Sequence, residues 1–540
     1  MVIFKSPHGT LALPKDRTIW DDLEKYATET PDARYLICGA SDRVITYKEA
    51  YDRACAIAAG LYDEGLRKGD VVIALTINCV EYPILFLALN RLTVTCSPSF
   101  TEFQPHELAR QLLRTKAKRI FVHPSMLELA RQGAAAAGFP ENLVFSLADT
   151  PPPAGVRSLQ EFLAAPRPLP PLPRVDPDAV VMLPFSSGTA GHPKGVLHTA
   201  RGLYAAAMHD AAIEERHPVI LAVLPFYHIF ATNLLHVTTQ LGLALLVLPG
   251  FEPELFLRSV SKYKVEKLSV VPAIAHFLAV HPLVDKFDLS ATKYVVTAAT
   301  AQPLEDVVRI KERLGIEVQQ GYGMTEFAGG VVIAENGKTR AGSVGRLLPN
   351  VELKVKSLEN DQDLGSNQRG ELLFRTPQTM IGYLDNTKAT KAMFTDDGFL
   401  RTGDLGFIDD DGYVFIVDRI KSLIKYKGHQ VSPVELEEIL VRHPLIAEAC
   451  CVRGRDLKTG EEIPKAYIVV TPNPPKRLTR MEVQLFVASK VAAFKRVRDV
   501  EFIDAIPKNA MGKIDRRKLQ VRENIKQKGL AAPPPSLSRL

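Results

Sequence analysis

The sequence predicts a multidomain α/β protein, because strand-like apolar runs alternate with amphipathic helical stretches through about its first 340 residues. The run Val71–Leu75 reads as a buried strand followed by a helical stretch at 82–90, and Arg119–Val122 repeats the pattern. Prolines crowd the segment 150–177, which we expect to be an extended connector. These features indicate two α/β subdomains joined by that connector.

The sequence pattern changes after this α/β region. Short alternating strands separated by turn residues fill 342–417, and Asp409–Gly412 predicts the turn of a hairpin, so we expect a small β-barrel-like subdomain. Ser432, Pro433 and Glu435 have the pattern of a helix N-terminus, and that helix opens an α+β C-terminal domain. The expected division is a large N-terminal domain at 1–417, a junction at 418–421, a C-terminal domain at 422–525 and a flexible tail at 526–540.

Composition excludes several classes of protein. The chain has 540 residues, 46% of them hydrophobic, which is enough for several cores. Its six cysteines are scattered without paired C-x-x-C clusters, so we expect a reducing compartment and no structural zinc. The net charge of +6 is spread among interleaved acidic and basic residues, which does not favour nucleic-acid binding. Neither a signal-peptide core nor a membrane-spanning run of about 18 apolar residues is evident, so an intracellular, soluble protein is expected.

The most informative segment is SSGTAGHPKG, which extends from Ser186 to Gly195 and follows an apolar strand. Small hydroxyl residues and glycines allow backbone N–H groups to surround phosphate oxygens, and Lys194 adds a positive charge. The segment departs from the Walker pattern, because Gly195 stands where a magnesium-binding Ser or Thr would follow the lysine. A surface loop is the alternative interpretation, but the combined pattern favours a phosphate loop.

This loop resembles the phosphate loop of the adenylate-forming (AMP-binding) superfamily, which comprises acyl-CoA synthetases, adenylation domains and beetle luciferases. It differs mainly at Ala190, where a second threonine is usual. The other motifs of that superfamily follow in the same order, and they are LPFYHIF (224–230), QGYGMTE (320–326), TGDL (402–405), DRIKSLIKYKGHQV (418–431) and PKNAMGK (507–513). The resemblance covers almost the whole chain, is closest to coumarate–CoA ligases, and implies ATP, Mg²⁺ and coenzyme A as ligands.

The resemblance implies specific roles in nucleotide binding. Tyr322 offers a ring face to adenine, Thr325 lies beside the α-phosphate, and Glu326 binds Mg²⁺, a hard cation that prefers carboxylate oxygen. Asp404 can accept hydrogen bonds from both ribose hydroxyls, with Arg419 near the same ribose. The full set of implied cofactor contacts is Ser186, Ser187, Gly188, Thr189, Ala190, Gly191, Lys194, Thr300, Ala301, Gln320, Gly321, Tyr322, Gly323, Met324, Asp404, Arg419, Lys427, Gly428 and Gln430.

The resemblance also implies two catalytic steps. Lys513 neutralises charge while the carboxylate attacks the α-phosphorus of ATP. The junction at 418–421 is then a hinge, about which the mobile C-terminal domain turns for thioester formation. In that second arrangement Lys425 contacts the nucleotide, Gly428 lets pantetheine pass close to the backbone, and His228 lies at the acyl pocket and thiol entry.

Acid–CoA ligation is the simplest function for this set of motifs. A luciferase-like monooxygenase is the alternative, because it shares the adenylation step and the lysine that matches Lys425. A third candidate is an adenylation enzyme that loads a carrier protein, although no carrier module follows the C-terminal domain.

The choice of acid stays open between aryl, cinnamic and fatty acids. Thr300 stands where aromatic-acid ligases usually have glycine, and its branched side chain reshapes the expected pocket. The residues that match the walls of the acyl pocket are Tyr227, His228, Thr300, Gly321, Phe327 and Ala328.

The tripeptide Ser538-Arg539-Leu540 resembles the peroxisomal address Ser-Lys-Leu. For a eukaryotic source it predicts recognition by the peroxisomal import receptor and a location in peroxisomes or a glycosome-like organelle. For any other source we expect a cytoplasmic enzyme.

Overall fold

The computed structural model describes residues 2–148, 152–186, 193–213, 215–298, 302–426, 429–456, 461–472, 474–508 and 514–527. The chain divides into two compact units. The large unit comprises Ile3–Leu353 and Phe374–Leu400, and the small unit comprises Met1–Val2, Lys354–Leu373 and Arg401–Leu540. This division groups residues 401–417 with the C-terminal part of the chain, whereas the sequence predicts a boundary at 417, and that boundary stays a prediction.

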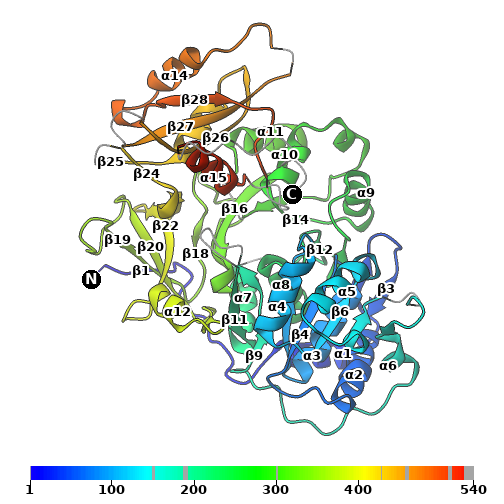
Figure 1. Ribbon diagram of the computed structural model, residues 1–540. Coiled ribbons are helices and arrows are strands. Elements are labelled where there is room, and N and C mark those ends of the chain that lie inside the picture. Colours follow the sequence, from blue (N-terminus) through cyan, green and yellow to red (C-terminus); the bar gives the residue numbers. More distant parts are fainter. Residues whose placement is uncertain are drawn as a thin grey trace. The chain divides into compact units, whose positions relative to one another are not determined.

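The first sheet of the large unit contains β4, which is labelled in Figure 1, and β4 pairs with β5 in parallel. Strand β4 is almost completely buried, as expected for a parallel strand covered on both faces. In spatial order the sheet comprises β10 (Phe185–Ser186), β11 (Lys194–Thr199), β9 (Val180–Met182), β5 (Thr95–Pro98), β4 (Val71–Leu75), β6 (Arg119–Val122), β7 (Val144–Ser146) and β8 (Arg157–Ser158), and β21 (Gly382–Tyr383) pairs with β11.

Two more sheets complete the large unit. The first consists of β12 (Val219–Ala222), β13 (Ala244–Val247), β2 (Arg34–Cys38) and β3 (Val44–Thr46), in that order. The second consists of β14 (Lys267–Val270), β15 (Tyr294–Thr297), β16 (Glu317–Met324), β17 (Gly329–Ile333) and β18 (Arg346–Leu347). At the edge of the unit, β1 (Phe4–Lys5) pairs antiparallel with the first residues of β19 (Glu352–Lys356).

Helices surround these sheets, and α2 packs on α3 while α7 packs on α8. Helix α3 has the position expected after Val71–Leu75, and all its residues from Tyr82 to Asn90 are buried. The helices are α1 (Ile19–Glu29), α2 (Tyr47–Asp63), α3 (Glu81–Arg91), α4 (Pro105–Thr115), α5 (Leu127–Ala136), α6 (Gln160–Ala164), α7 (Ala200–Ile213), α8 (Ile229–Leu241), α9 (Pro253–Tyr263), α10 (Pro272–Val280), α11 (Leu304–Leu314) and α12 (Thr387–Met393).

The proline-crowded segment is less uniform than predicted. Within 150–177 the chain forms β8 and α6 before it continues without regular structure. Phe162 of α6 is buried, its ring stacks 6.0 Å from that of Phe145, and it fills the space beside Gly60. A single large apolar side chain thus anchors part of the expected connector to the core.

The small unit has its own apolar core, which includes Ile424, Leu436 and Val483. The predicted hairpin is confirmed, because β22 and β23 pair antiparallel and Gly412 has a positive φ of 82° in the turn. The predicted helix is also confirmed, because the Ser432 side chain caps α13 by accepting from the Glu435 N–H. The elements are β20 (Gly370–Arg375, to Leu373 in this unit), β22 (Leu400–Ile408), β23 (Val414–Arg419), β24 (Ile424–Tyr426), β25 (His429–Val431), α13 (Pro433–Leu440), β26 (Ile446–Arg455), β27 (Glu462–Val470), α14 (Arg480–Ala488), β28 (Asp499–Phe502) and α15 (Arg516–Gln527).

One core residue makes the large unit sensitive to acid. His236 of α8 is 1% exposed, and neither ring nitrogen has a hydrogen-bond partner among the described residues. Its ring lies edge-on to Phe86 at a centroid distance of 5.7 Å. Burial lowers the pKa of His236 from 6.5 to about 3. Between these two values the unfolded chain binds more protons than the folded protein, so the free energy of unfolding falls as the pH decreases.

We expect His236→Leu to reduce this acid sensitivity. Between neutral pH and about pH 4.5, the variant should lose about 2 to 3 kcal/mol less unfolding free energy than the wild type, because it lacks the buried histidine at position 236. Urea unfolding of both proteins at the two pH values measures this difference. Identical losses in the two proteins would show that His236 does not titrate across this interval.

In the parts of the chain that the structure describes, every helix falls short of the length and apolar character needed to cross a membrane.

Candidate active site

Strands β10 and β11 bring the two ends of the predicted phosphate loop together. They pair antiparallel, with Ser186 opposite Lys194 and Phe185 opposite Gly195. The short connection expected from the sequence therefore begins and ends at neighbouring backbone positions. Residues 187–192, and with them the predicted contacts Ser187, Gly188, Thr189, Ala190 and Gly191, lie outside the described residues.

The predicted metal ligand Glu326 lies in a tight turn between β16 and β17. A side chain at Gly323 would place its Cβ 2.0 Å from the backbone oxygen of Gly329, so only glycine allows these strands to approach so closely. Glu326 is 6% exposed, and its Oε1 accepts a 2.7 Å hydrogen bond from the Tyr383 hydroxyl. The Met380 N–H also donates to the Glu326 backbone oxygen at 2.8 Å. One hydrogen bond therefore holds the carboxylate of Glu326, and a second holds its backbone.

A buried histidine holds the neighbouring residue of this turn. The Nε2 atom of His198, on β11, lies 2.7 Å from the backbone oxygen of Thr325. A carbonyl only accepts, so Nε2 carries the hydrogen, and Nδ1 has no partner among the described residues. Burial lowers the pKa of His198 to about 4, which keeps the ring neutral at physiological pH. The strand that leaves the phosphate loop thus positions the predicted α-phosphate contact.

A buried amide side chain also contacts this turn. Gln378 is fully buried, and its Nε2 donates 2.7 Å hydrogen bonds to the backbone oxygens of Phe327 and Gly330. Its Oε1 lies 2.6 Å from His209 Nδ1. Sequence reasoning missed His198, Gln378 and Tyr383, because each acts through a partner far away in the chain.

The structure places Tyr227, one of the predicted acyl-pocket residues, beside another aromatic ring. Tyr227 is mostly buried, its ring lies 5.1 Å from that of Phe100, and its hydroxyl donates to Glu102 Oε1 at 3.2 Å. His228 occupies the N-cap position of α8. Phe327 is fully buried, and Ala328 has a positive φ of 57° at the end of the turn.

Tyr322, the predicted adenine contact, lies on β16. Its ring centroid lies 5.8 Å from that of Phe374. Gln320, Gly321, Gly323 and Met324 belong to the same strand, which pairs with β15 on one side and β17 on the other. The predicted contacts Thr300 and Ala301 lie outside the described residues.

In the small unit, the hairpin joins the two residues predicted to contact the ribose. Asp404 and Arg419 are paired in the register of β22 and β23, and the Nε of Arg419 lies 2.7 Å from Asp404 Oδ1. The carboxylate side chain is only 3% exposed, whereas the guanidinium is 44% exposed. An ion pair with one buried partner holds Asp404 in a fixed orientation.

The small unit also contains the residues predicted for the second step. Lys425 is exposed and stands opposite Gln430 in the β24–β25 pair. The predicted junction begins at Asp418, whose Oδ2 accepts from the Ser432 hydroxyl and, at 3.2 Å, from the Val434 N–H. The predicted residues Lys427, Gly428 and Lys513 lie outside the described residues, as does the terminal tripeptide Ser538-Arg539-Leu540.

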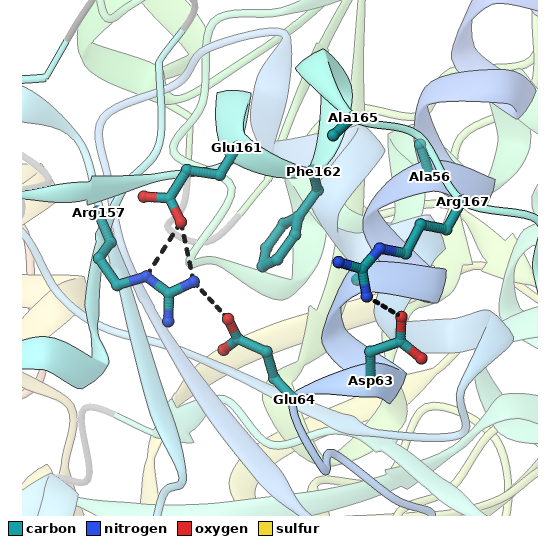
Figure 2. Close-up of a pocket in the computed structure, with 9 residues that line it drawn as sticks. Ala56, Asp63, Glu64, Arg157, Glu161, Phe162, Ala165 and Arg167 are labelled. Atoms are coloured by element: carbon teal, nitrogen blue, oxygen red, sulfur yellow. Dashed lines mark hydrogen bonds and ion pairs between the residues drawn. The ribbon is translucent and has the colours of Figure 1, made fainter.

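Two cavities of the large unit are lined by other residues. The first, about 290 Å³, is lined by residues of α2, β8 and α6 (Figure 2). Its charges are internally paired, because Arg157 contacts Glu64 and Glu161 while Arg167 contacts Asp63. The second, about 310 Å³, lies beside α1, α7 and α8. Neither contains a residue predicted for catalysis.

The residues present fit a magnesium ion that is bound together with nucleotide. No group of three or more His, Cys, Asp or Glu side chains able to hold a metal occurs within the described ranges. Mg²⁺ bound with ATP usually takes one or two carboxylates, with phosphate and water oxygens as its other ligands. Glu326, buried and anchored through one of its two oxygens, provides a carboxylate of this kind.

Comparison with known proteins gives consistent matches. Residues 23–384 match the AMP-binding enzyme family, and residues 435–513 match the C-terminal domain of that family. The chain is 36% identical to 4-coumarate–CoA ligase 3 of Oryza sativa subsp. japonica, over 97% of this chain and 95% of that protein. It is 34% identical to 4-coumarate–CoA ligase of Pinus taeda, over 92% and 93% of the two chains.

Solved structures agree with these sequence matches. The fold is similar to that of an anthranilate–CoA ligase in complex with anthranoyl-AMP, with a TM-score of 0.86, 26% identity and coverage of 96% and 99% of the two chains. It is also similar to O-succinylbenzoate–coenzyme A synthetase of Bacillus subtilis in complex with ATP and magnesium, with a TM-score of 0.80, 25% identity and coverage of 93% and 99%. Because the family match spans most of the chain and the sequence relatives align along nearly all of it, this protein belongs to the AMP-binding enzyme family.

Proposed function

We propose that this protein is an ATP-dependent, AMP-forming acid–CoA ligase. One observation carries the proposal: Lys194 of the phosphate loop and the buried carboxylate of Glu326 both contact Tyr383. Lys194 makes no ion pair with any carboxylate in the described parts of the chain, and Glu326 makes none with any described cation. A site for MgATP needs a cation that binds the triphosphate and a carboxylate that binds Mg²⁺. Lys194 and Glu326 provide these two charges.

The reaction proceeds in two steps with a shared intermediate. A carboxylate oxygen of the acid bonds to the α-phosphorus of ATP, and pyrophosphate leaves. The sulfur of coenzyme A then bonds to the acyl carbon, its proton is lost, and AMP leaves with the electrons of the broken acyl–phosphate bond. Lys194 and Lys513 offset negative charge on the phosphates during the first step, and Thr325 lies beside the α-phosphate.

Mg²⁺, when bound, screens the phosphate charges so that the anionic acid can approach. Glu326 would hold it, with His198 and Gln378 fixing the backbone of that turn. The protein's own contribution is therefore a rigid carboxylate, rather than one that must be ordered when the nucleotide binds.

We propose aromatic acids, either aryl or cinnamic, as the substrates. Tyr227, which matches a wall of the family's acyl pocket, has two more aromatic rings next to it: the centroid distances are 5.1 Å for Phe100–Tyr227 and 5.1 Å for Phe100–Phe103. Relatives named for 4-coumarate and anthranilate support this choice. Thr300 stands where aromatic-acid ligases usually have glycine, and its branched side chain reshapes the expected pocket. Conversion of fatty acids is therefore the alternative outcome of the assay.

The test is incubation of purified protein with ATP, Mg²⁺, coenzyme A and a panel of aryl, cinnamic, medium-chain and long-chain acids. We expect AMP, pyrophosphate and one class of CoA thioester, identified by mass spectrometry. Oxygen-dependent light emission from a luciferin, without a thioester product, would instead support a monooxygenase. Transfer only to a carrier protein would support the adenylation-domain alternative.

Removal of the Asp404 carboxylate should weaken the use of ATP. Hydrogen bonds to a charged group contribute about 1.5 to 3 kcal/mol, so Asp404→Ala should raise the KM for ATP at least about tenfold. Asp410→Ala is a matched control, because Asp410 lies in the turn of the same hairpin and accepts from Ser366 and Asn367. Equal KM values for the two variants would exclude Asp404 from the nucleotide site.

A further inference from the structure

Tyr383 is fixed directly beside the strand that leaves the phosphate loop. It pairs with Val196 in the register of β21 and β11, and the next residue, Leu384, donates its N–H to the Gly195 oxygen at 2.9 Å. Its own N–H donates to Thr390 Oγ1 at 2.9 Å. Backbone pairing therefore fixes Tyr383 beside Gly195 and Val196, the two residues that follow Lys194.

The side chain of Tyr383 connects this strand to the predicted metal ligand. Its hydroxyl lies 2.7 Å from Glu326 Oε1, and the tyrosine side chain is mostly buried. A carboxylate oxygen only accepts, so the tyrosine hydroxyl donates this hydrogen bond. One carboxylate oxygen is thus committed to the tyrosine, which fixes the orientation of the other.

The aromatic ring of the same side chain contacts the phosphate-loop lysine. Lys194 Nζ lies 4.7 Å from the centroid of the Tyr383 ring, within the range of a cation–π interaction. A free lysine near a carboxylate would form an ion pair, and that pair would neutralise both charges before the nucleotide arrives. The ring gives the ammonium a different partner and leaves the carboxylate with a neutral donor.

We infer that Tyr383 is a positioning residue for MgATP: its hydroxyl aims Glu326 at the metal, and its ring keeps Lys194 available for the phosphates. The inference rests on the proposed function, because that function assigns Glu326 to Mg²⁺ and Lys194 to ATP. Tyr383 itself does not touch the reacting atoms in this account. Its two effects are separable, since the hydroxyl serves the metal ligand and the ring serves the lysine.

Two substitutions separate these effects. Tyr383→Phe removes the hydroxyl and keeps the ring, whereas Tyr383→Leu removes both. Tyr35→Phe is the matched control, because it also removes a buried tyrosine hydroxyl, which lies 2.7 Å from Thr239 Oγ1 and is remote in sequence from the predicted site. Circular dichroism and thermal unfolding of all three variants establish that they fold.

Binding is measured without turnover. Electron paramagnetic resonance reports Mn²⁺ bound to the protein in the presence of α,β-methylene ATP, and fluorescence titration reports binding of the same analogue without metal. We expect Tyr383→Phe to weaken Mn²⁺ binding about tenfold while metal-free nucleotide binding is unchanged. Tyr383→Leu should also weaken metal-free nucleotide binding, by about threefold to fivefold. Tyr35→Phe should change neither affinity.

The selective effect of Tyr383→Phe on metal binding should also appear in the steady-state reaction. Tyr383→Phe should shift the free Mg²⁺ concentration for half-maximal adenylation upward, by about the factor seen for Mn²⁺. If Tyr383→Phe binds Mn²⁺ as tightly as Tyr35→Phe does, the inference is wrong. A wild-type protein that forms no adenylate with any acid would contradict the proposed function instead, and the binding experiments would still report on Tyr383 independently.

Discussion

Lys513→Ala should lose adenylate formation while it retains thioester formation from supplied acyl-adenylate. In the first step a carboxylate meets the α-phosphate of ATP, so two anions approach and negative charge grows on the phosphate oxygens. Removal of one fixed charge-stabilising group typically costs about 100-fold to 1000-fold in rate. The second step has no such encounter, because coenzyme A attacks the uncharged acyl carbon. Pyrophosphate release and thioester formation, assayed separately, measure the two steps.

Lys508→Ala provides the control for this experiment. Lys508 lies in the same motif, pairs with Ile514 across a β-bridge, and contacts Glu448 at 3.0 Å. It should retain both half-reactions, because an exposed ion pair contributes little to stability or rate. Equal loss of both half-reactions in Lys513→Ala would contradict the assignment of this lysine to the first step alone, and with it the role proposed for the junction at 418–421.

Arg516→Ala should unfold the small unit at markedly lower urea concentrations. One terminal nitrogen of Arg516 contacts both carboxylate oxygens of Glu437, at 2.8 and 2.6 Å, and its Nε donates to the Cys451 oxygen at 3.1 Å. Glu437 is 9% exposed, and burial raises the pKa of its carboxyl group despite the arginine. Without Arg516 a buried acid loses its counter-charge, which costs about 3 to 5 kcal/mol.

A second variant distinguishes this loss from a general effect on α15. Arg522 lies on the same helix and contacts Glu501 at 2.8 Å, but its side chain is 42% exposed. Arg522→Ala should cost about 1 kcal/mol or less. Hydrogen exchange of the β26 amides locates the change, since the Cys451 N–H donates to Glu437. Equal unfolding midpoints for the two variants would mean that the buried pair does not stabilise the unit.

Local signals in the sequence were sufficient for many elements. Val71–Leu75 and Arg119–Val122 are strands as predicted, because an uninterrupted apolar run specifies burial on both faces. Ser432 and Pro433 begin a helix because their effects act within one turn. The Glu435 N–H donates to the Ser432 side chain, whereas the Glu435 carboxylate contacts Lys495, a residue 60 positions away.

Long-range contacts account for what the sequence did not show. Tyr383 and Glu326 are 57 residues apart, and His198 and Thr325 are 127 apart, so no spacing rule predicts that they meet. The helix at Gln160–Ala164 was missed because proline content dominated the prediction, whereas Phe162 had apolar partners from β7 and α2. The resemblance, in contrast, named Asp404 and Arg419 together, and the hairpin brings them into contact.

Acid-dependent exchange of radiolabelled pyrophosphate into ATP tests the central claim most directly, because only reversible formation of an acyl-adenylate returns label to ATP. We expect exchange that requires both Mg²⁺ and a carboxylic acid, that needs no coenzyme A, and that is lost in Lys513→Ala. Absence of exchange by the folded wild-type protein, with every acid of an aryl, cinnamic and fatty-acid panel, would contradict it.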